Sequence, residues 1–160
     1  MARITRYQGA IIKDHHVLLL RHQEHQTGRS YWLFPGGGIE EGETEEQCVA
    51  REMFEETGLT VKVERLLFTQ PFSQPDGYKQ RKMYLCSILD GEAKPGYEPE
   101  EDASELYGIV EVKWFDLRDV KAWDKDVWGK NVMNEHLEPQ VLELQKVLGY
   151  QQIIVSTLLV

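Results

Sequence analysis

The sequence of 160 residues predicts a single domain (residues 1–160) of the α/β (α+β) class. Two observations favour this class: β-rich runs stand on both sides of a strong helix signal, and a second helix signal lies near the C-terminus. No Pro, Gly or Ser linker is long enough to separate two domains. The 41% of apolar residues supplies a hydrophobic core and excludes wholesale disorder.

The first third of the chain contains three expected strands. Residues 7–12 and 17–22 are β-rich runs separated by Lys13-Asp14-His15-His16, which is typical of a hairpin. The run Val17-Leu18-Leu19-Leu20 predicts a strand that is buried on both faces. Residues 31–34 form a third, short apolar strand, which ends at Pro35 and the three glycines after it.

The strongest helix signal lies between Thr44 and Gly58. Thr44 and Gln47 have the spacing of a capping box, and Gly58 is placed to cap the C-terminus. At 100° per residue, one face carries Glu45, Cys48, Glu52, Glu55 and Glu56, and the opposite face carries Val49, Ala50, Met53 and Phe54. We therefore expect a helix with one core face and one carboxylate face.

The rest of the chain predicts more strands and a terminal helix. Strands are expected over residues 61–68, 82–89 and 109–115, with a short extra strand near 69–72 as an option. A helix over about 139–148 follows from an apolar stripe that Gly149 ends. Residues 153–160 form a β-prone apolar tail. Either the chain's own sheet or a second copy in a homodimer would cover this tail, and both alternatives stay open.

The charge balance limits the partners. The chain has 18 Lys and Arg against 27 Asp and Glu, a formal net charge of −9. A sequence-independent grip on nucleic acid or on an anionic membrane needs clustered basic residues, so this charge argues against both. No apolar run approaches the roughly 20 residues of a membrane helix. Two cysteines without C-x-x-C spacing predict no disulfide framework and indicate a cytoplasmic location.

A group of carboxylates on the expected helix points to chemistry. Glu52, Glu55 and Glu56 are immediate neighbours at i, i+3 and i+4, where like charges repel by a few tenths of a kcal/mol per pair. Nothing in the fold requires this repulsion. Clustered carboxylate oxygens are the ligands that Mg²⁺ or Mn²⁺ prefers.

The glycines before the helix add a second element. Gly36, Gly37 and Gly38 allow a tight turn in which a carbonyl points at a metal or the backbone closely approaches a phosphate. Together with the carboxylates they favour a metal-dependent site that acts on a small phosphorylated compound. Bound ions at such a site lower the pKa of an attacking water.

The segment over residues 37–59 reads GGIEEGETEEQCVAREMFEETGL and resembles the Nudix box, G-x5-E-x7-R-E-U-x-E-E-x-G-U, where U is a bulky apolar residue. The matched positions are Gly37, Glu43, Arg51, Glu52, Met53, Glu55, Glu56, Gly58 and Leu59. The strand pair over residues 7–22 and the segments 32–37 and 111–115 also look like the Nudix domain. The resemblance implies an α/β/α sandwich on a mixed β-sheet. It also implies hydrolysis of a pyrophosphate bond in a nucleoside diphosphate linked to another moiety, by water attack on phosphorus.

The resemblance also implies roles for single residues. Divalent ions, Mg²⁺ or Mn²⁺, would be held by Glu52, Glu55, Glu56 and the backbone carbonyl of Gly36. Arg51 and Glu43 look like the family's orienting pair. The general base is either Glu52 or a carboxylate of a later loop, for which the candidates are Glu98, Glu100, Glu101 and Glu105. The residues that we expect to contact the nucleotide-type substrate are Arg21, Gly37, Gly38, Lys79 and Arg81.

The substrate stays open at this point among a nucleotide sugar, ADP-ribose, a dinucleoside polyphosphate and a nucleoside triphosphate. Pro75 resembles a marker of ADP-ribose hydrolases, whereas Tyr78 lies near the place expected in dinucleoside polyphosphate hydrolases. Thr69-Gln70-Pro71 resembles part of the NADH-hydrolysing branch. An alternative function is a nucleotide sensor that binds on the same fold without hydrolysis, although a module that only binds has no need for the complete carboxylate set.

Overall fold

The computed structural model describes residues 4–72, 77–97, 107–123, 125–128 and 136–151. Its elements in chain order are β1 (Thr5–Lys13), β2 (His16–Glu24), β3 (Ser30–Leu33), β4 (Gly36–Gly37), α1 (Glu45–Thr57), β5 (Thr60–Pro71), β6 (Gln80–Asp90), β7 (Tyr107–Asp116), η1 (Val120–Ala122), α3 (Lys125–Trp128) and α4 (Leu137–Leu148). None of the helices in these ranges is long and apolar enough to cross a membrane.

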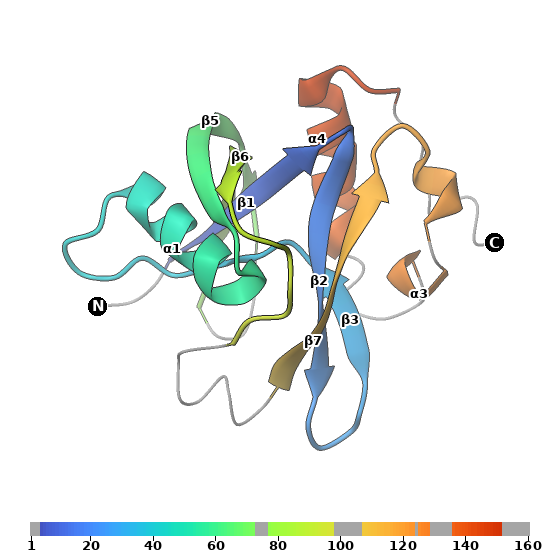
Figure 1. Cartoon of the computed structure of the whole chain (residues 1–160), viewed down its shortest axis with the longest axis horizontal. Helices are drawn as coiled ribbons and strands as arrows, with labels where there is room; N and C mark the ends of the chain where they lie inside the picture. The colour runs from blue at the N-terminus through green and yellow to red at the C-terminus, as the bar shows by residue number, and fades with distance from the viewer. Residues whose placement is uncertain (1–3, 73–76, 98–106, 124, 129–135, 152–160) are drawn as a thin grey trace.

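The seven strands form a mixed sheet, as predicted. The path runs β3-β2-β1-β6-β5, with β4 paired to β1 and β7 paired to β2. The pair β1 and β6 is parallel, whereas the other strand pairs are antiparallel. β1 and β2 pair at the hairpin end, Ile12 with Val17 and Lys13 with His16, and then diverge (Figure 1). The sheet therefore opens into one half around β1 and another around β2.

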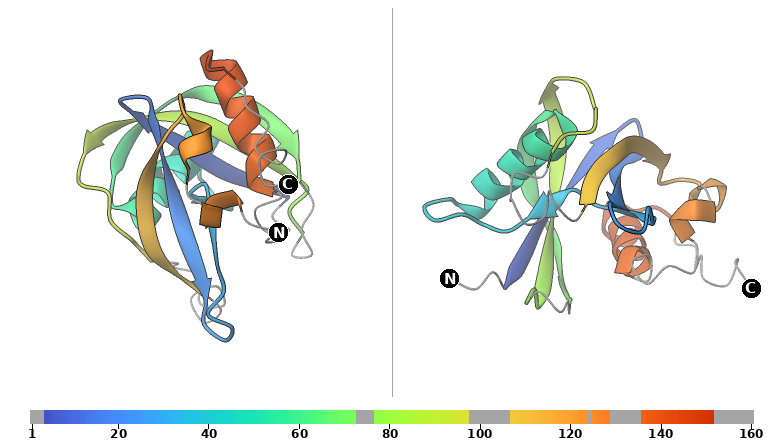
Figure 2. Two further views of the ribbon diagram at one scale, coloured as in Figure 1. Left: turned by 90° about the vertical axis from the view of Figure 1, so that its right-hand side faces the viewer. Right: turned by 90° about the horizontal axis from the view of Figure 1, so that it is seen from below.

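Helices cover both sides of the sheet, so the predicted α/β/α sandwich is confirmed. α1 lies on one side and α4 on the other (Figure 2). Residues of alternating direction on β1 contribute to two separate cores: Ile11 packs with Met53 of α1, and Ala10 packs with Leu144 of α4. β1 is therefore the strand from which both faces of the sheet are built.

Most predicted elements are present. Leu18 and Leu19 are fully buried in different cores, which confirms a strand covered on both faces. The optional strand near 69–72 is not separate, because Thr69 and Gln70 continue the pairing of β5 with β6. The short elements β4, η1 and α3 were not predicted, since two to four residues show no periodicity. The apolar tail over 153–160 lies outside the described residues.

The prediction of one core face and one carboxylate face on α1 is wrong. Phe54 is 57% exposed, whereas Glu52 and Glu56 are 4% and 0% exposed. Cys48, expected among the carboxylates, is buried in the core with Met53. The arc that α1 turns toward the sheet therefore contains both apolar residues and the two carboxylates.

Candidate active site

Both ends of α1 are fixed in place. At the N-terminus, the Thr44 hydroxyl accepts a hydrogen bond from the Gln47 amide at 3.1 Å, and the Gln47 side chain accepts one from the Thr44 amide at 2.9 Å. Glu45 then ties the first turn to β6, because it accepts hydrogen bonds from the Tyr84 hydroxyl and from Lys82. The Tyr84 hydrogen bond and the Lys82 charge hold the pKa of Glu45 below its usual range, despite partial burial.

The C-terminal turn of α1 is held by a segment that follows β6. Backbone amides of Lys94, Gly96 and Tyr97 donate to the carbonyl oxygens of Thr57, Glu56 and Glu55, at 2.9, 3.0 and 3.1 Å. We call residues 92–97 the strap. Helix C-termini leave carbonyl groups without intrahelical partners, and the strap satisfies three of them. It thereby fixes the backbone that carries Glu55 and Glu56.

Arg51 joins the acidic residues of the site. Its Nε and Nη2 atoms donate to the two carboxylate oxygens of Glu43, at 2.7 and 2.9 Å. Its Nη1 atom donates to Glu52 at 3.0 Å and to Glu55 at 3.2 Å. The Glu43 hydrogen bonds and the Glu52 charge raise the pKa of Arg51, so the guanidinium stays charged. One cation therefore holds three carboxylates in a group.

Glu52 is under electrostatic strain in this arrangement. Burial raises its pKa to about 7, although the nearby charges of Arg51 and Arg6 act in the opposite direction. Burial also raises the pKa of Glu55. A cation placed beside these carboxylates would favour their charged forms.

The glycines of β4 and the residue after it contact the same group of carboxylates. The Gly36 amide donates to Glu56 at 2.7 Å, and the Gly38 carbonyl accepts from Arg51 at 3.1 Å. A side chain at Gly37 would overlap the Glu52 carboxylate. The predicted juxtaposition of glycines and carboxylates is therefore present, and glycine at position 37 is what allows Glu52 to approach the backbone.

The donor set of this face suits a hard divalent cation. Glu52, Glu55, Glu56 and the Gly36 backbone offer oxygen ligands, which Mg²⁺ and Mn²⁺ prefer. Within the described ranges, however, no three His, Cys, Asp or Glu side chains converge as a group that could hold a metal ion. The hydrogen bonds from Arg51 use one carboxylate oxygen of Glu52, Oε1, and one of Glu55, Oε2.

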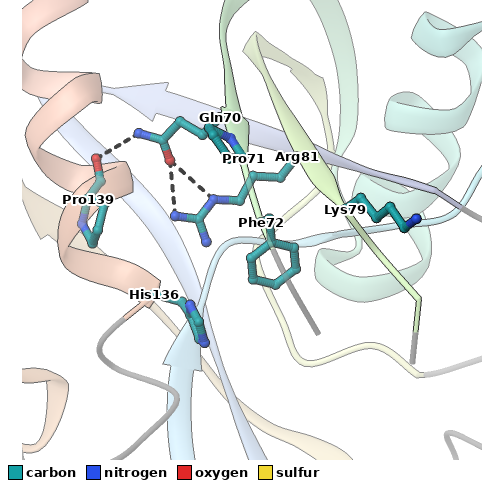
Figure 3. A pocket seen from close by; sticks show the side chains of 7 residues that line it. All are labelled: Gln70, Pro71, Phe72, Lys79, Arg81, His136 and Pro139. Carbon is teal, nitrogen blue, oxygen red and sulfur yellow. Dashed lines mark hydrogen bonds between the residues drawn. The ribbon is translucent and has the colours of Figure 1, made fainter. Parts of the chain in front are cut away.

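The five residues predicted to contact substrate do not all gather at one place. Gly37 and Gly38 lie at the carboxylates, as described above. Arg21 instead donates to Glu111 of β7 at 3.0 Å and to Ser30 at 3.2 Å. Lys79 and Arg81 line a separate pocket of about 670 Å³ (Figure 3).

This pocket, which we call the Arg81 pocket, lies between the end of β5, the start of β6 and the start of α4. Its lining residues are Gln70, Pro71, Phe72, Lys79, Arg81, His136 and Pro139. Sequence reasoning missed Phe72, His136 and Pro139 as site residues. No local signal marks His136 and Pro139, because α4 begins at Leu137, 47 positions after β6 ends at Asp90.

The tryptophans that could stack on a nucleobase and the later acidic residues that could act as bases are the remaining sequence candidates. Trp32, Trp123 and Trp128 are buried in the core beside α4, so they pack the fold rather than present a free face to a nucleobase. The candidate bases Glu98, Glu100, Glu101 and Glu105 and the substrate marker Pro75 lie outside the described residues.

The chain matches the family model described as "NUDIX domain" over residues 4–136. The chain therefore belongs to the NUDIX domain family, and the predicted membership is confirmed.

Two curated relatives share more than a third of their residues with the chain over the aligned region. The NAD-capped RNA hydrolase NudC of Photobacterium profundum is 40% identical over 94 residues, which cover 59% of this chain and 34% of that protein. The ADP-ribose pyrophosphatase of Methanocaldococcus jannaschii is 36% identical over 95 residues, which cover 58% of this chain and 56% of that protein. The chain thus spans about a third of the first relative's length.

Solved structures agree on the fold. A UDP-X diphosphatase superposes with a TM-score of 0.62 at 23% identity, covering 95% of this chain and 66% of that chain. A MutT NUDIX hydrolase from Burkholderia pseudomallei superposes with a TM-score of 0.53 at 28% identity, covering 72% of this chain and 83% of that chain.

Proposed function

We propose that this protein is a divalent-metal-dependent hydrolase of a pyrophosphate bond in a nucleoside diphosphate linked to another moiety. The observation that carries the proposal is the group of buried and half-buried carboxylates around Arg51, beside the glycines of β4. Buried carboxylates on a helix destabilise the fold unless a positive charge compensates them. A bound divalent cation would supply that charge and would also bind the phosphates of a substrate.

Each part of the site has a role in this proposal. Glu52, Glu55, Glu56 and the Gly36 carbonyl would hold Mg²⁺ or Mn²⁺, and these ions would supply charge neutralisation of the phosphates and a water of lowered pKa. Arg51 and Glu43 orient the carboxylates. The general base would be Glu52 or one of the later acidic residues Glu98, Glu100, Glu101 and Glu105.

The names of the two curated relatives narrow the substrates to test first. NAD and ADP-ribose both join adenosine to a second ribose through a pyrophosphate. We propose compounds of this type, followed by nucleotide sugars, dinucleoside polyphosphates and nucleoside triphosphates.

The test is hydrolysis of these compounds with Mg²⁺ in ¹⁸O-water, followed by mass analysis of the products. Glu56→Gln should lose at least 100-fold in kcat while its thermal unfolding stays cooperative. Glu46→Gln, an exposed change in the first turn of the same helix, is the matched control. If Glu56→Gln kept wild-type turnover, or no compound took up ¹⁸O, the proposal would be wrong.

A further inference from the structure

The Arg81 pocket is cationic in a protein whose net charge is −9. Among the described residues that line it, Arg81, Lys79 and His136 are basic and none is Asp or Glu. Acidic residues outnumber basic ones in the chain, so a pocket with this lining stands out from the rest of the surface. Its composition favours an anionic ligand.

Arg81 is buried and held ready to donate. Only 4% of Arg81 is exposed, and its Nε and Nη2 atoms donate to the Gln70 side-chain oxygen at 3.2 and 3.0 Å. Gln70 is fixed in turn, since its amide nitrogen donates to the Pro139 carbonyl at 3.0 Å. The orientation of the guanidinium is therefore set from two elements, β5 and α4.

The other side of the guanidinium has no partner of opposite charge in the part of the chain that the structure describes. No ion pair of Arg81 is found there, and neither hydrogen bond to Gln70 uses Nη1. In Figure 3 the third guanidinium nitrogen points away from Gln70, on the side of Phe72 and His136. The Phe72 ring lies 4.8 Å from Arg81 Cζ and covers one face of the group. A guanidinium with N–H groups left over is suited to bind an anion.

The pocket faces away from α1. Lys82, the next residue on β6, points to α1 and bonds Glu45, so strand alternation directs Arg81 to the opposite face of the sheet. The phosphates that lie against the α1 carboxylates therefore cannot occupy the Arg81 pocket at the same time. Both sites nevertheless adjoin the same part of β1, because Tyr7 pairs with Gly37 of β4 and Arg6 pairs with Arg81 of β6.

We propose that the Arg81 pocket binds a phosphomonoester of the substrate, separate from the pyrophosphate that is cleaved. The inference rests on the proposed function, because it assigns a substrate class to the same enzyme. It predicts a preference for nucleotides that carry an additional phosphate on one of their sugars. Arg81 provides the fixed hydrogen-bond donor, and the exposed Lys79 adds a second positive charge.

The first test measures binding without hydrolysis. With EDTA present, the acidic arc of α1 repels phosphate, so a titration with ribose 5-phosphate followed by amide NMR shifts reports on the cationic pocket. Shifts are expected at the amides of Gln70, Phe72 and residues 79–81, and ribose should cause none. Arg81→Gln should abolish them. Shifts confined to α1, or none at all, would overturn the proposal.

The second test compares kcat/KM within three matched pairs: NADP⁺ with NAD⁺, coenzyme A with dephospho-coenzyme A, and ADP-ribose 1″-phosphate with ADP-ribose. The phosphorylated member of at least one pair should be favoured by 10-fold or more, about 1.4 kcal/mol. Arg81→Gln and Lys79→Ala should remove this preference through KM. Lys121→Ala, an exposed lysine outside the pocket, should retain it.

The outcomes separate this inference from the proposed function. If all six compounds were hydrolysed without preference, the inference would be overturned and the proposed function would stand. The same holds if ribose 5-phosphate bound but no pair showed a preference, since the pocket would then take a separate anion. If no compound were hydrolysed, the proposed function would fail, and the titration would still decide whether the pocket binds a phosphomonoester.

Discussion

Arg51 and Glu43 form a two-point ion pair, in which Nε and Nη2 each donate to a different carboxylate oxygen, at 2.7 and 2.9 Å. A lysine keeps the charge but cannot reproduce this fork. Arg51→Lys should therefore lower the free energy of unfolding by about 1–3 kcal/mol, measured by urea titration.

The control for this change is a second two-point ion pair between an arginine and a carboxylate, which lies on the surface. Arg118 donates to both carboxylate oxygens of Asp116, at 2.9 Å each, but its side chain is 53% exposed. Arg118→Lys should lower the free energy of unfolding far less than Arg51→Lys does, because exposed ion pairs contribute little. Equal losses in the two variants would contradict the central role given to Arg51.

The stability of the metal-free protein should depend on the Glu52 proton. The folded-state pKa of about 7 lies above the usual 4.5, so the folded protein binds more protons than the unfolded chain between these values. The contribution of the Glu52 proton to stability is fully present below pH 4.5. It should be lost as pH rises from 4.5 through 7, which lowers the free energy of unfolding by up to roughly 3 kcal/mol. Thermal unfolding in EDTA at pH 5.5 and pH 8 measures the change.

Two variations complete that experiment. Glu52→Gln should flatten the pH dependence, because the titrating group is gone. Mg²⁺ should raise the melting temperature more at pH 8 than at pH 5.5, since the charged carboxylate binds the ion. A steeper loss of stability in Glu52→Gln than in the wild type would rule out this explanation.

Substitution of Gly96 in the strap should displace the backbone that carries Glu55 and Glu56. A methyl group at Gly96 would overlap the Glu55 carbonyl oxygen, which the Tyr97 amide binds. Gly96→Ala should therefore cost about 1–3 kcal/mol in stability and also lower kcat. At Gly108 the nearest atom to such a methyl group is 3.5 Å away, so Gly108→Ala should leave both quantities near their wild-type values.

The observed orientation of α1 predicts a large effect at one of two adjacent apolar residues and almost none at the other. Met53 is fully buried, and Met53→Ala should cost about 2–5 kcal/mol. Phe54 is mostly exposed, and Phe54→Ser should change the free energy of unfolding by less than about 0.5 kcal/mol. Chemical denaturation of the two variants checks the assignment, and a large loss in Phe54→Ser would speak against it.

The sequence was informative where structure is local. The capping box at Thr44 and the left-handed Gly58 define the ends of α1, and both depend on residues within four positions of each other. Arg51 and Glu52 are consecutive in the sequence, so they lie on the same helix. These features could be read without any knowledge of the sheet.

Features that depend on distant segments were not predictable in the same way. A helical wheel places Glu52 and Glu56 near one another, but it contains no information that β4 approaches them and covers them. The Arg81 pocket needs α4 beside β5, a contact that only the folded chain creates. The helical wheel therefore placed Glu52 and Glu56 on one arc, as observed, but predicted an exposed face where the structure buries them.

The anchoring of α1 at both ends has a consequence for fragments of this protein. A fragment that ends at residue 79 contains the whole Nudix box, but it lacks the β6 residues Lys82 and Tyr84 and the strap. It also lacks the parallel pairing of β1 with β6, which joins Thr5 to Gln80. A 13-residue helix is marginal by itself in water, and its crowded carboxylates disfavour it further. During synthesis, the acidic site should therefore assemble only after about residue 97 has left the ribosome.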